Sequence, residues 1–209
     1  MPVTEHPMQA LAAYLPEGSF EQVVEYLHHY KVHLTVTKQR KSVLGDYRHA
    51  GMGRNHRISI NGNLNKFEFL ITLLHELAHL LTFEQYGNKV ESHGREWKHL
   101  YSHLLVTFIQ HKIFPADIEK ALQASVLNPA ATANGETALL LVLRKYNPVQ
   151  KEDHVHLAYL PEGALFMMDN GKIFRKGLIR RKRFDCEEIK TGLHYSVSPV
   201  IEVKMMKKG

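Results

Sequence analysis

The sequence predicts an α+β fold in two parts: a mainly helical part at 1–128 and a β-rich, basic part at 137–209. Three observations support this. A leucine-rich segment at 66–86 has helical spacing. Short segments before it alternate apolar and polar residues, as strands do. The last third of the chain contains several such runs separated by turn-forming residues. The small, turn-rich segment 129–136 is the predicted linker.

The remaining elements follow from local signals. A capping-box pattern that begins at Ser19 predicts a helix that runs to about Tyr30. Alternation predicts strands at 32–37 and 57–61 and, after the linker, at 137–146. Further helices are expected at about 94–111 and from Pro115 to near Ser125, because proline favours the first turn of a helix.

The helix at 66–86 carries the strongest local signals. Asn65 is a good N-cap, Glu68 lies three positions later, and no proline or glycine interrupts the segment before Gly87. Leucines that recur at steps of three and four residues would bury this helix: Leu70, Leu73, Leu74, Leu77, Leu80 and Leu81.

The most informative motif, H-E-x-x-H at 75–79, lies on this helix. Residues four apart share a helix face, so His75 and His79 can offer two imidazole nitrogens to one metal ion. Glu76 is close enough to hydrogen-bond a water on that metal without binding the metal itself. The motif therefore indicates a zinc hydrolase with Glu76 as its general base.

A catalytic zinc site normally has three protein ligands and a water molecule. The best third candidate is His93, which lies where the next helix should begin and could fold back over the first helix. Glu91 and Glu96 are rival ligands, because some zinc hydrolases use a carboxylate in this position. The spacing favours His93 without excluding either carboxylate.

Residues 75–87, followed by His93-Gly94-Arg95-Glu96-Trp97, resemble the SprT-like zinc metalloproteases, the group to which Spartan belongs. Residues 44–47 and 58–61 resemble the short strands that precede the active-site helix in that family. The resemblance covers about residues 20–125.

This resemblance implies a compact zincin-like helical domain with a small antiparallel sheet. It also implies one catalytic Zn2+ bound by His75, His79 and His93, with Glu76 as general base. The implied activity is cleavage of proteins, including proteins attached to DNA. The strand at 57–61 is expected to pair with an extended substrate backbone, as sheet edges do.

The C-terminal part departs from the family pattern. Members of the family often carry a zinc ribbon there, and this region resembles such a ribbon, with a hairpin turn predicted at Asn170-Gly171. The chain has a single cysteine, Cys186, and one thiol cannot hold a four-ligand zinc. Apolar packing should replace the metal, and Cys186 should be a buried or idle thiol.

Most of the net charge of +6 comes from this C-terminal region. Its basic residues could neutralise nucleic-acid phosphates, although alternation along a strand would place only half of 180–183 on one side. The candidate nucleic-acid contacts are Lys172, Arg175, Lys176, Arg180, Arg181, Lys182 and Arg183.

The composition excludes an intramolecular disulfide, because there is one cysteine, and no apolar stretch is long enough to span a membrane. With no secretory signal visible, a cytoplasmic location is expected. The leading hypothesis is a zinc metallopeptidase whose partners are protein substrates and DNA. The alternatives are a DNA-associated regulatory module with a structural or vestigial zinc site, and a zinc hydrolase with a non-peptide substrate.

Overall fold

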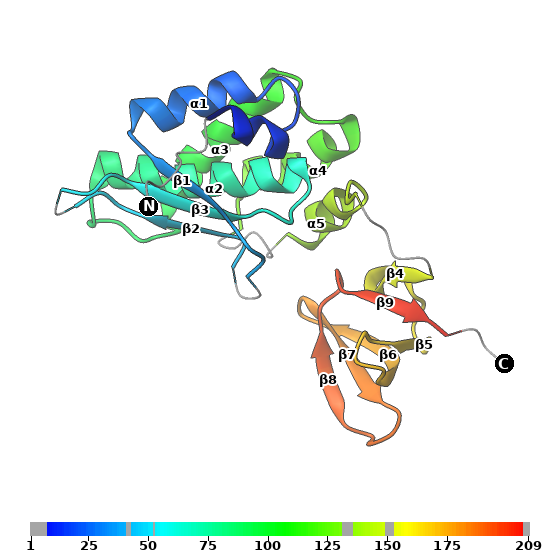
Figure 1. Cartoon of the computed structure of the whole chain (residues 1–209). Helices are drawn as coiled ribbons and strands as arrows, with labels where there is room; N and C mark the ends of the chain where they lie inside the picture. The colour runs from blue at the N-terminus through cyan, green and yellow to red at the C-terminus, as the bar shows by residue number, and fades with distance from the viewer. Residues whose placement is uncertain (1–7, 41–42, 52, 131–135, 149–152, 207–209) are drawn as a thin grey trace, which may run out of the picture. The chain divides into compact units, whose positions relative to one another are not determined.

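The computed structural model describes residues 8–40, 43–51, 53–130, 136–148 and 153–206. The chain forms two compact units, residues 1–146 and 147–209, and each unit has its own apolar core (Figure 1). The first unit contains η1 (Met8–Tyr14), α1 (Phe20–His29), β1 (His33–Thr37), β2 (Gly45–Arg48), β3 (Arg57–Asn61), α2 (Lys66–Tyr86), α3 (Arg95–Gln110), α4 (Ala116–Leu127) and α5 (Thr137–Arg144).

Helix α2 is the central element of the first unit and has the predicted bounds. The Asn65 side chain accepts a hydrogen bond from the Glu68 N–H at 3.0 Å, and Gly87, with a φ of 62°, ends the helix. Nearly every residue from Glu68 to Thr82 is buried, because α3 packs on one side of α2 while β2 and β3 lie across another (Figure 1). Side chains near the middle of α2 are therefore held in the protein interior.

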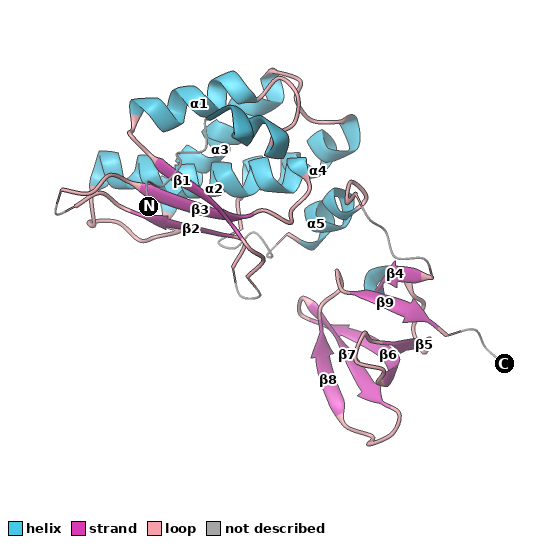
Figure 2. Ribbon diagram, in the orientation of Figure 1, coloured by secondary structure: helices cyan, strands magenta, loops and turns pink. Residues whose placement is uncertain are grey.

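The small sheet has the strand order β1-β3-β2, with β3 in the centre (Figure 2). Strand β2 is antiparallel to β3, but β1 is parallel to β3, so the prediction of a purely antiparallel sheet was wrong in this respect. The reason is the chain path: β2 occupies the outer edge, and β3 then returns between β2 and β1. Ile58 and Ile60 are buried on the side of the core.

Two predicted helix starts can be compared with the structure. Helix α1 begins after Ser19, as predicted, but Ser19 does not cap it, because its hydroxyl donates to the Pro16 carbonyl at 2.7 Å. Helix α4 begins directly after Pro115, as predicted.

The strand predicted at 137–146 was wrong, because residues 137–144 form helix α5. Leu139 and Leu143 are buried in the core of the first unit. The Leu143 carbonyl accepts a hydrogen bond from Asn65 Nδ2 at 2.9 Å, and Arg144 pairs with the buried Glu68 at 3.4 Å. The division between the units accordingly falls after Tyr146 rather than at 129–136, and residues 131–135 of the predicted linker lie outside the described residues.

The docking of α5 should contribute measurably to stability. Leu143→Ala removes a side chain that is 1% exposed, and we expect it to lower the free energy of unfolding by about 2–4 kcal/mol. The matched control is Leu127→Ala, since Leu127 is 86% exposed and its truncation should change stability by about 0.5 kcal/mol or less. Urea unfolding of both variants measures the difference, and equal stabilities would contradict the role assigned to α5.

The second unit is a six-stranded antiparallel sheet with the order β4-β9-β5-β6-β7-β8. A turn at Asn170-Gly171 joins β5 and β6, as predicted. The buried apolar core includes Cys186, as predicted, and burial raises the pKa of its thiol. The elements are β4 (His154–His156), η3 (Leu157–Tyr159), β5 (Leu165–Met167), β6 (Ile173–Arg180), β7 (Arg183–Glu188), β8 (His194–Val197) and β9 (Glu202–Met205).

Within the described ranges, no helix combines the length and apolar character needed to cross a bilayer. Helix α2, the longest, has 21 residues.

Candidate metal centre and active site

Three histidines meet between α2 and the start of α3. One nitrogen from each of His75, His79 and His93 lies within 4.8 Å of the others, and the Nε2 atoms of His75 and His93 are 3.3 Å apart. Two nitrogens bound to a tetrahedral zinc at 2.0–2.1 Å would be separated by about 3.3 Å. The three imidazoles therefore suit a zinc ion. Among the described residues this is the only such cluster of potential ligands, and neither Glu91 nor Glu96 belongs to it.

The imidazoles are in the protonation state that metal binding requires. Burial, together with the neighbouring histidines, lowers the pKa of His75 to about 3 and that of His79 to about 4. Burial also lowers the pKa of His93. All three rings are therefore neutral at pH 7, with lone pairs available to a cation.

Trp97 lies against all three histidines and was not identified as a site residue from the sequence. It is fully buried, and its ring centroid lies 4.8, 5.3 and 4.7 Å from those of His75, His79 and His93. Tyr101 stacks on Trp97 at 5.0 Å. The available signal was the four-residue spacing of 93, 97 and 101. His93 lies in the turn just before α3, and Trp97 and Tyr101 follow on one face of that helix.

Glu76 is the acidic group beside this cluster. It is 7% exposed. Its pKa is raised to about 8, because burial and the charge of Asp46 outweigh the opposing effect of Arg40. Among the described residues, no hydrogen bond or ion pair engages its carboxylate. An uncommitted carboxylate in this position is free to bind and activate a water molecule.

A hydrogen-bond chain anchors β2 to α2 next to the site. The Ala50 N–H donates to His56 Nδ1 at 3.3 Å, so this nitrogen is an acceptor and Tyr47 Oη, 2.8 Å away, also donates to it. His56 Nε2 then carries the proton and faces Glu84 at 3.2 Å. The Tyr47 ring is parallel to that of His79, with centroids 6.5 Å apart. These residues were missed, because strand pairing and not sequence spacing brings them together.

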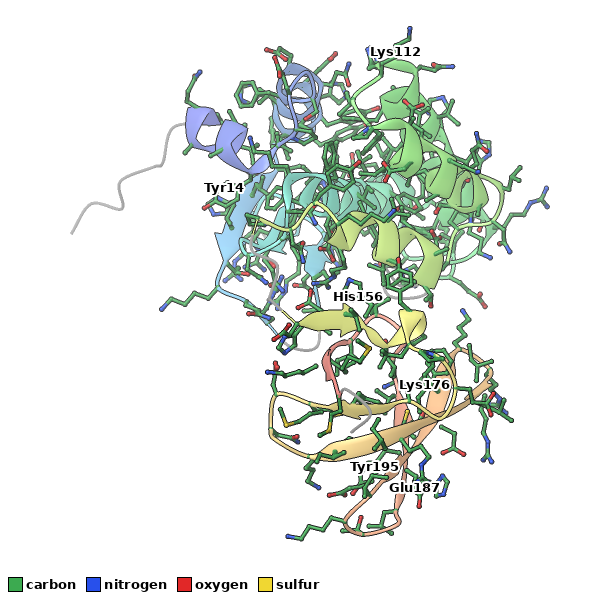
Figure 3. All side chains as sticks on the ribbon, turned by 90° about the vertical axis from the view of Figure 1, so that its right-hand side faces the viewer. Tyr14, Lys112, His156, Lys176, Glu187 and Tyr195 are labelled. Atoms are coloured by element: carbon green, nitrogen blue, oxygen red, sulfur yellow. The ribbon has the colours of Figure 1, made fainter. Side chains whose placement is uncertain are left out.

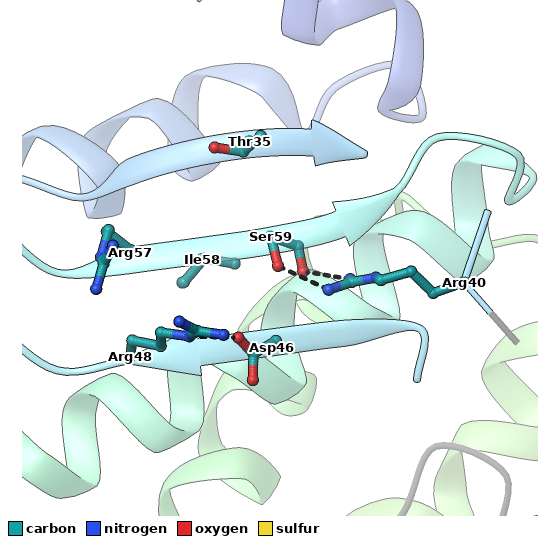
Figure 4. Close-up of a pocket in the computed structure, with 7 residues that line it drawn as sticks. All are labelled: Thr35, Arg40, Asp46, Arg48, Arg57, Ile58 and Ser59. Atoms are coloured by element: carbon teal, nitrogen blue, oxygen red, sulfur yellow. Dashed lines mark hydrogen bonds and ion pairs between the residues drawn. The ribbon is translucent and has the colours of Figure 1, made fainter. Parts of the chain in front are cut away.

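A shallow pocket of about 210 Å³ lies on the sheet and is lined by three arginines (Figure 4). The Arg40 guanidinium bonds Asn61 Oδ1 at 2.8 Å and Ser59 Oγ at 3.0 Å, and Arg48 pairs with Asp46 at 3.0 Å. The Arg40 bonds hold the segment before β2 against β3.

The predicted basic residues are not all available at the surface. Lys176 is 5% exposed and donates to the Ala158 and Leu160 carbonyls inside the second unit (Figure 3). The other paired residues are engaged as follows: Lys172 with Glu188 at 3.1 Å, Arg175 with Glu187 at 3.2 Å, Arg180 with Asp185 at 3.2 Å, and Arg183 with the Ser196 carbonyl at 3.1 Å. Arg181 and Lys182 form the exposed turn between β6 and β7.

The first unit thus combines a buried helix that carries two of the histidines, a third histidine from the turn before α3, and a small sheet that lies across α2. Such an α+β unit can hold a metal ion in its interior, bound by the three histidines. The SprT-like family model matches residues 13–117, half of the chain, and the chain belongs to the SprT-like family. Comparison with curated proteins and with solved structures gave no significant match.

Proposed function

We propose that this chain is a zinc-dependent endopeptidase of SprT-like type. The observation that carries the proposal is the convergence of His75, His79 and His93 within 4.8 Å beside the uncommitted carboxylate of Glu76. Membership of the SprT-like family supports it.

Zinc bound here would supply a Lewis acid that polarises the scissile carbonyl and lowers the pKa of a bound water to about 7. Glu76 would accept a proton as that water attacks the peptide and would then pass the proton to the leaving amine. Burial raises the pKa of Glu76, whereas the charge of a nearby dication would lower it. A pKa near neutrality suits a group that must both accept and donate a proton.

Substrate would bind along β2. The sequence-based assignment of this role to 57–61 was wrong, because β3 is the central strand and is paired on both sides. Strand β2 is an edge strand. Its Gly45 lies against Glu76, and its Tyr47 lies beside His79. An extended peptide paired with β2 would therefore have its backbone next to the catalytic carboxylate.

A metal-removal experiment tests the proposal. Cleavage of unfolded casein by the purified chain should fall to background after treatment with 1,10-phenanthroline and return when about one equivalent of Zn2+ is added. Cleavage that persists without metal would contradict the proposal. A chain that binds zinc but cleaves no protein would favour the DNA-associated regulatory module instead.

We extend the proposal to substrates attached to DNA, with the exposed turn at Arg181 and Lys182 contacting phosphates. In the same assay, DNA should accelerate histone cleavage, and added salt should weaken this effect. Arg181→Ser/Lys182→Ser should reduce the DNA effect and leave casein cleavage unchanged. An equal DNA effect in both proteins would exclude this turn as the contact.

A further inference from the structure

We propose that Gly45 is a positioning residue for Glu76: the side chain that glycine lacks leaves the space in which the catalytic carboxylate lies. The inference rests on the proposed function, since it assigns Gly45 a role in placing the general base. Gly45 is the first residue of β2, the strand that crosses α2 at Glu76.

Side chains of α2 fill the space that a side chain at position 45 would occupy. A Cβ atom at this position would lie 2.5 Å from Glu76 Oε1, 2.9 Å from Glu76 Cγ and 2.9 Å from Thr72 Cγ2. All three separations are too short for nonbonded atoms, so something must move if a methyl group is added. Gly45 is not among the residues with positive φ, so the backbone itself would accept alanine. Room for Glu76, and not backbone freedom, is therefore what requires glycine here.

Packing is what fixes the Glu76 carboxylate. Among the described residues no hydrogen bond or ion pair holds it, whereas its neighbour Thr72 is held by a 2.8 Å hydrogen bond to the Glu68 carbonyl. The carboxylate lies against β2 at Gly45. Because only van der Waals contact holds the Glu76 carboxylate, a larger side chain at position 45 should displace it.

Strand β2 cannot easily retreat, because it is anchored on both sides of Gly45. Before it, the Leu44 carbonyl accepts hydrogen bonds from the Asn61 N–H at 2.9 Å and from Arg40 at 3.4 Å. After it, the Tyr47 hydroxyl donates to His56, which is paired with Glu84 of α2. The strain of an added methyl group should therefore move the Glu76 side chain rather than the strand.

The test is Gly45→Ala in the zinc-loaded protein. We expect kcat for casein cleavage to fall by about 10- to 100-fold, because a displacement of about 1 Å in a catalytic group can have an effect of this size. KM should change by less than about 3-fold, because the added methyl group would point toward Glu76 and Thr72 of α2 and would leave the backbone groups of β2 unchanged. Zinc content should not change, because no ligand is altered.

Gly62→Ala is the matched control. An added Cβ at Gly62 would lie 2.7 Å from Val36 Cγ1. The substitution therefore creates a comparable steric clash at the same sheet without contact to Glu76. It should show a similar loss of thermal stability with kcat retained. The double variant Gly45→Ala/Thr72→Ser removes the Thr72 methyl and keeps its hydroxyl, and it should recover part of the lost kcat. Equal loss of kcat in both single variants would show that Gly45 contributes only to packing and does not position Glu76.

Crystal structures of the zinc-loaded wild type and Gly45→Ala provide a readout independent of activity. The Glu76 carboxylate should move by about 1 Å, with the three histidines in place. An unmoved carboxylate with unchanged kcat would overturn the proposal. A zinc-loaded wild type that cleaves nothing would refute the protease function, while the displacement of Glu76 would still test the role of Gly45.

Discussion

Replacing Glu76 by glutamine should lower kcat for protein cleavage by about 10²–10⁴-fold while bound zinc stays at one ion per chain. Glutamine has the shape of glutamate but cannot accept a proton from the attacking water. Glu76 is beside the histidine cluster and does not belong to it, so its replacement should leave the metal in place. The measurement combines steady-state cleavage of casein with metal analysis of the same sample.

The control for this variant is Glu96→Gln. Glu96 was a rival metal ligand on sequence grounds, but it lies outside the cluster formed by the histidines. Glu96→Gln should therefore keep both zinc and cleavage. Full activity in Glu76→Gln would refute the role of Glu76, and loss of zinc in Glu96→Gln would mean that a carboxylate completes the site.

His93→Asn should greatly weaken zinc binding, because it removes one of the three proposed ligands. Removing a mere outer-shell partner weakens metal binding by 10- to 100-fold, so removing a ligand should weaken zinc binding by more than about 100-fold. His93 is the only one of the three ligands outside α2, and its Nε2 lies 3.3 Å from that of His75. Competition with a chromophoric chelator measures the affinity directly.

His99→Asn is the matched control, because His99 is exposed on α3, the helix that follows His93, and lies outside the cluster. It should bind zinc like the wild type. Equal affinity in the His93 variant and the wild type would show that the third ligand is another residue.

The sequence predicted α2 to within its observed bounds, because the determinants are local: a cap at Asn65, leucines at helical spacing and Gly87 at the end. It failed at 137–144 for a physical reason. A short apolar run has no decisive period, and the choice between helix and strand depends on what buries it. Here Leu139 and Leu143 pack on the core of the first unit, and the Asn65 side chain satisfies a terminal carbonyl of α5.

In the candidate site, too, some residues could be predicted from the sequence and others could not. His75, Glu76 and His79 lie close together because helix geometry places them so, and that relation can be read from spacing. Gly45, Tyr47 and the edge position of β2 depend on strand order, which spacing does not reveal. The basic residues show the same limit, since cross-strand partners such as Glu187 and Glu188 engage residues that looked available in the sequence.

The most direct test of the central claim is X-ray absorption spectroscopy at the zinc edge of the protein loaded with one Zn2+. We expect three imidazole nitrogens and one oxygen at about 2.0–2.1 Å from the zinc ion. The same spectrum of His93→Asn, loaded under excess zinc, should lose one imidazole. Only two imidazoles in the wild type, or a sulfur at about 2.3 Å, would refute a site made of three histidines.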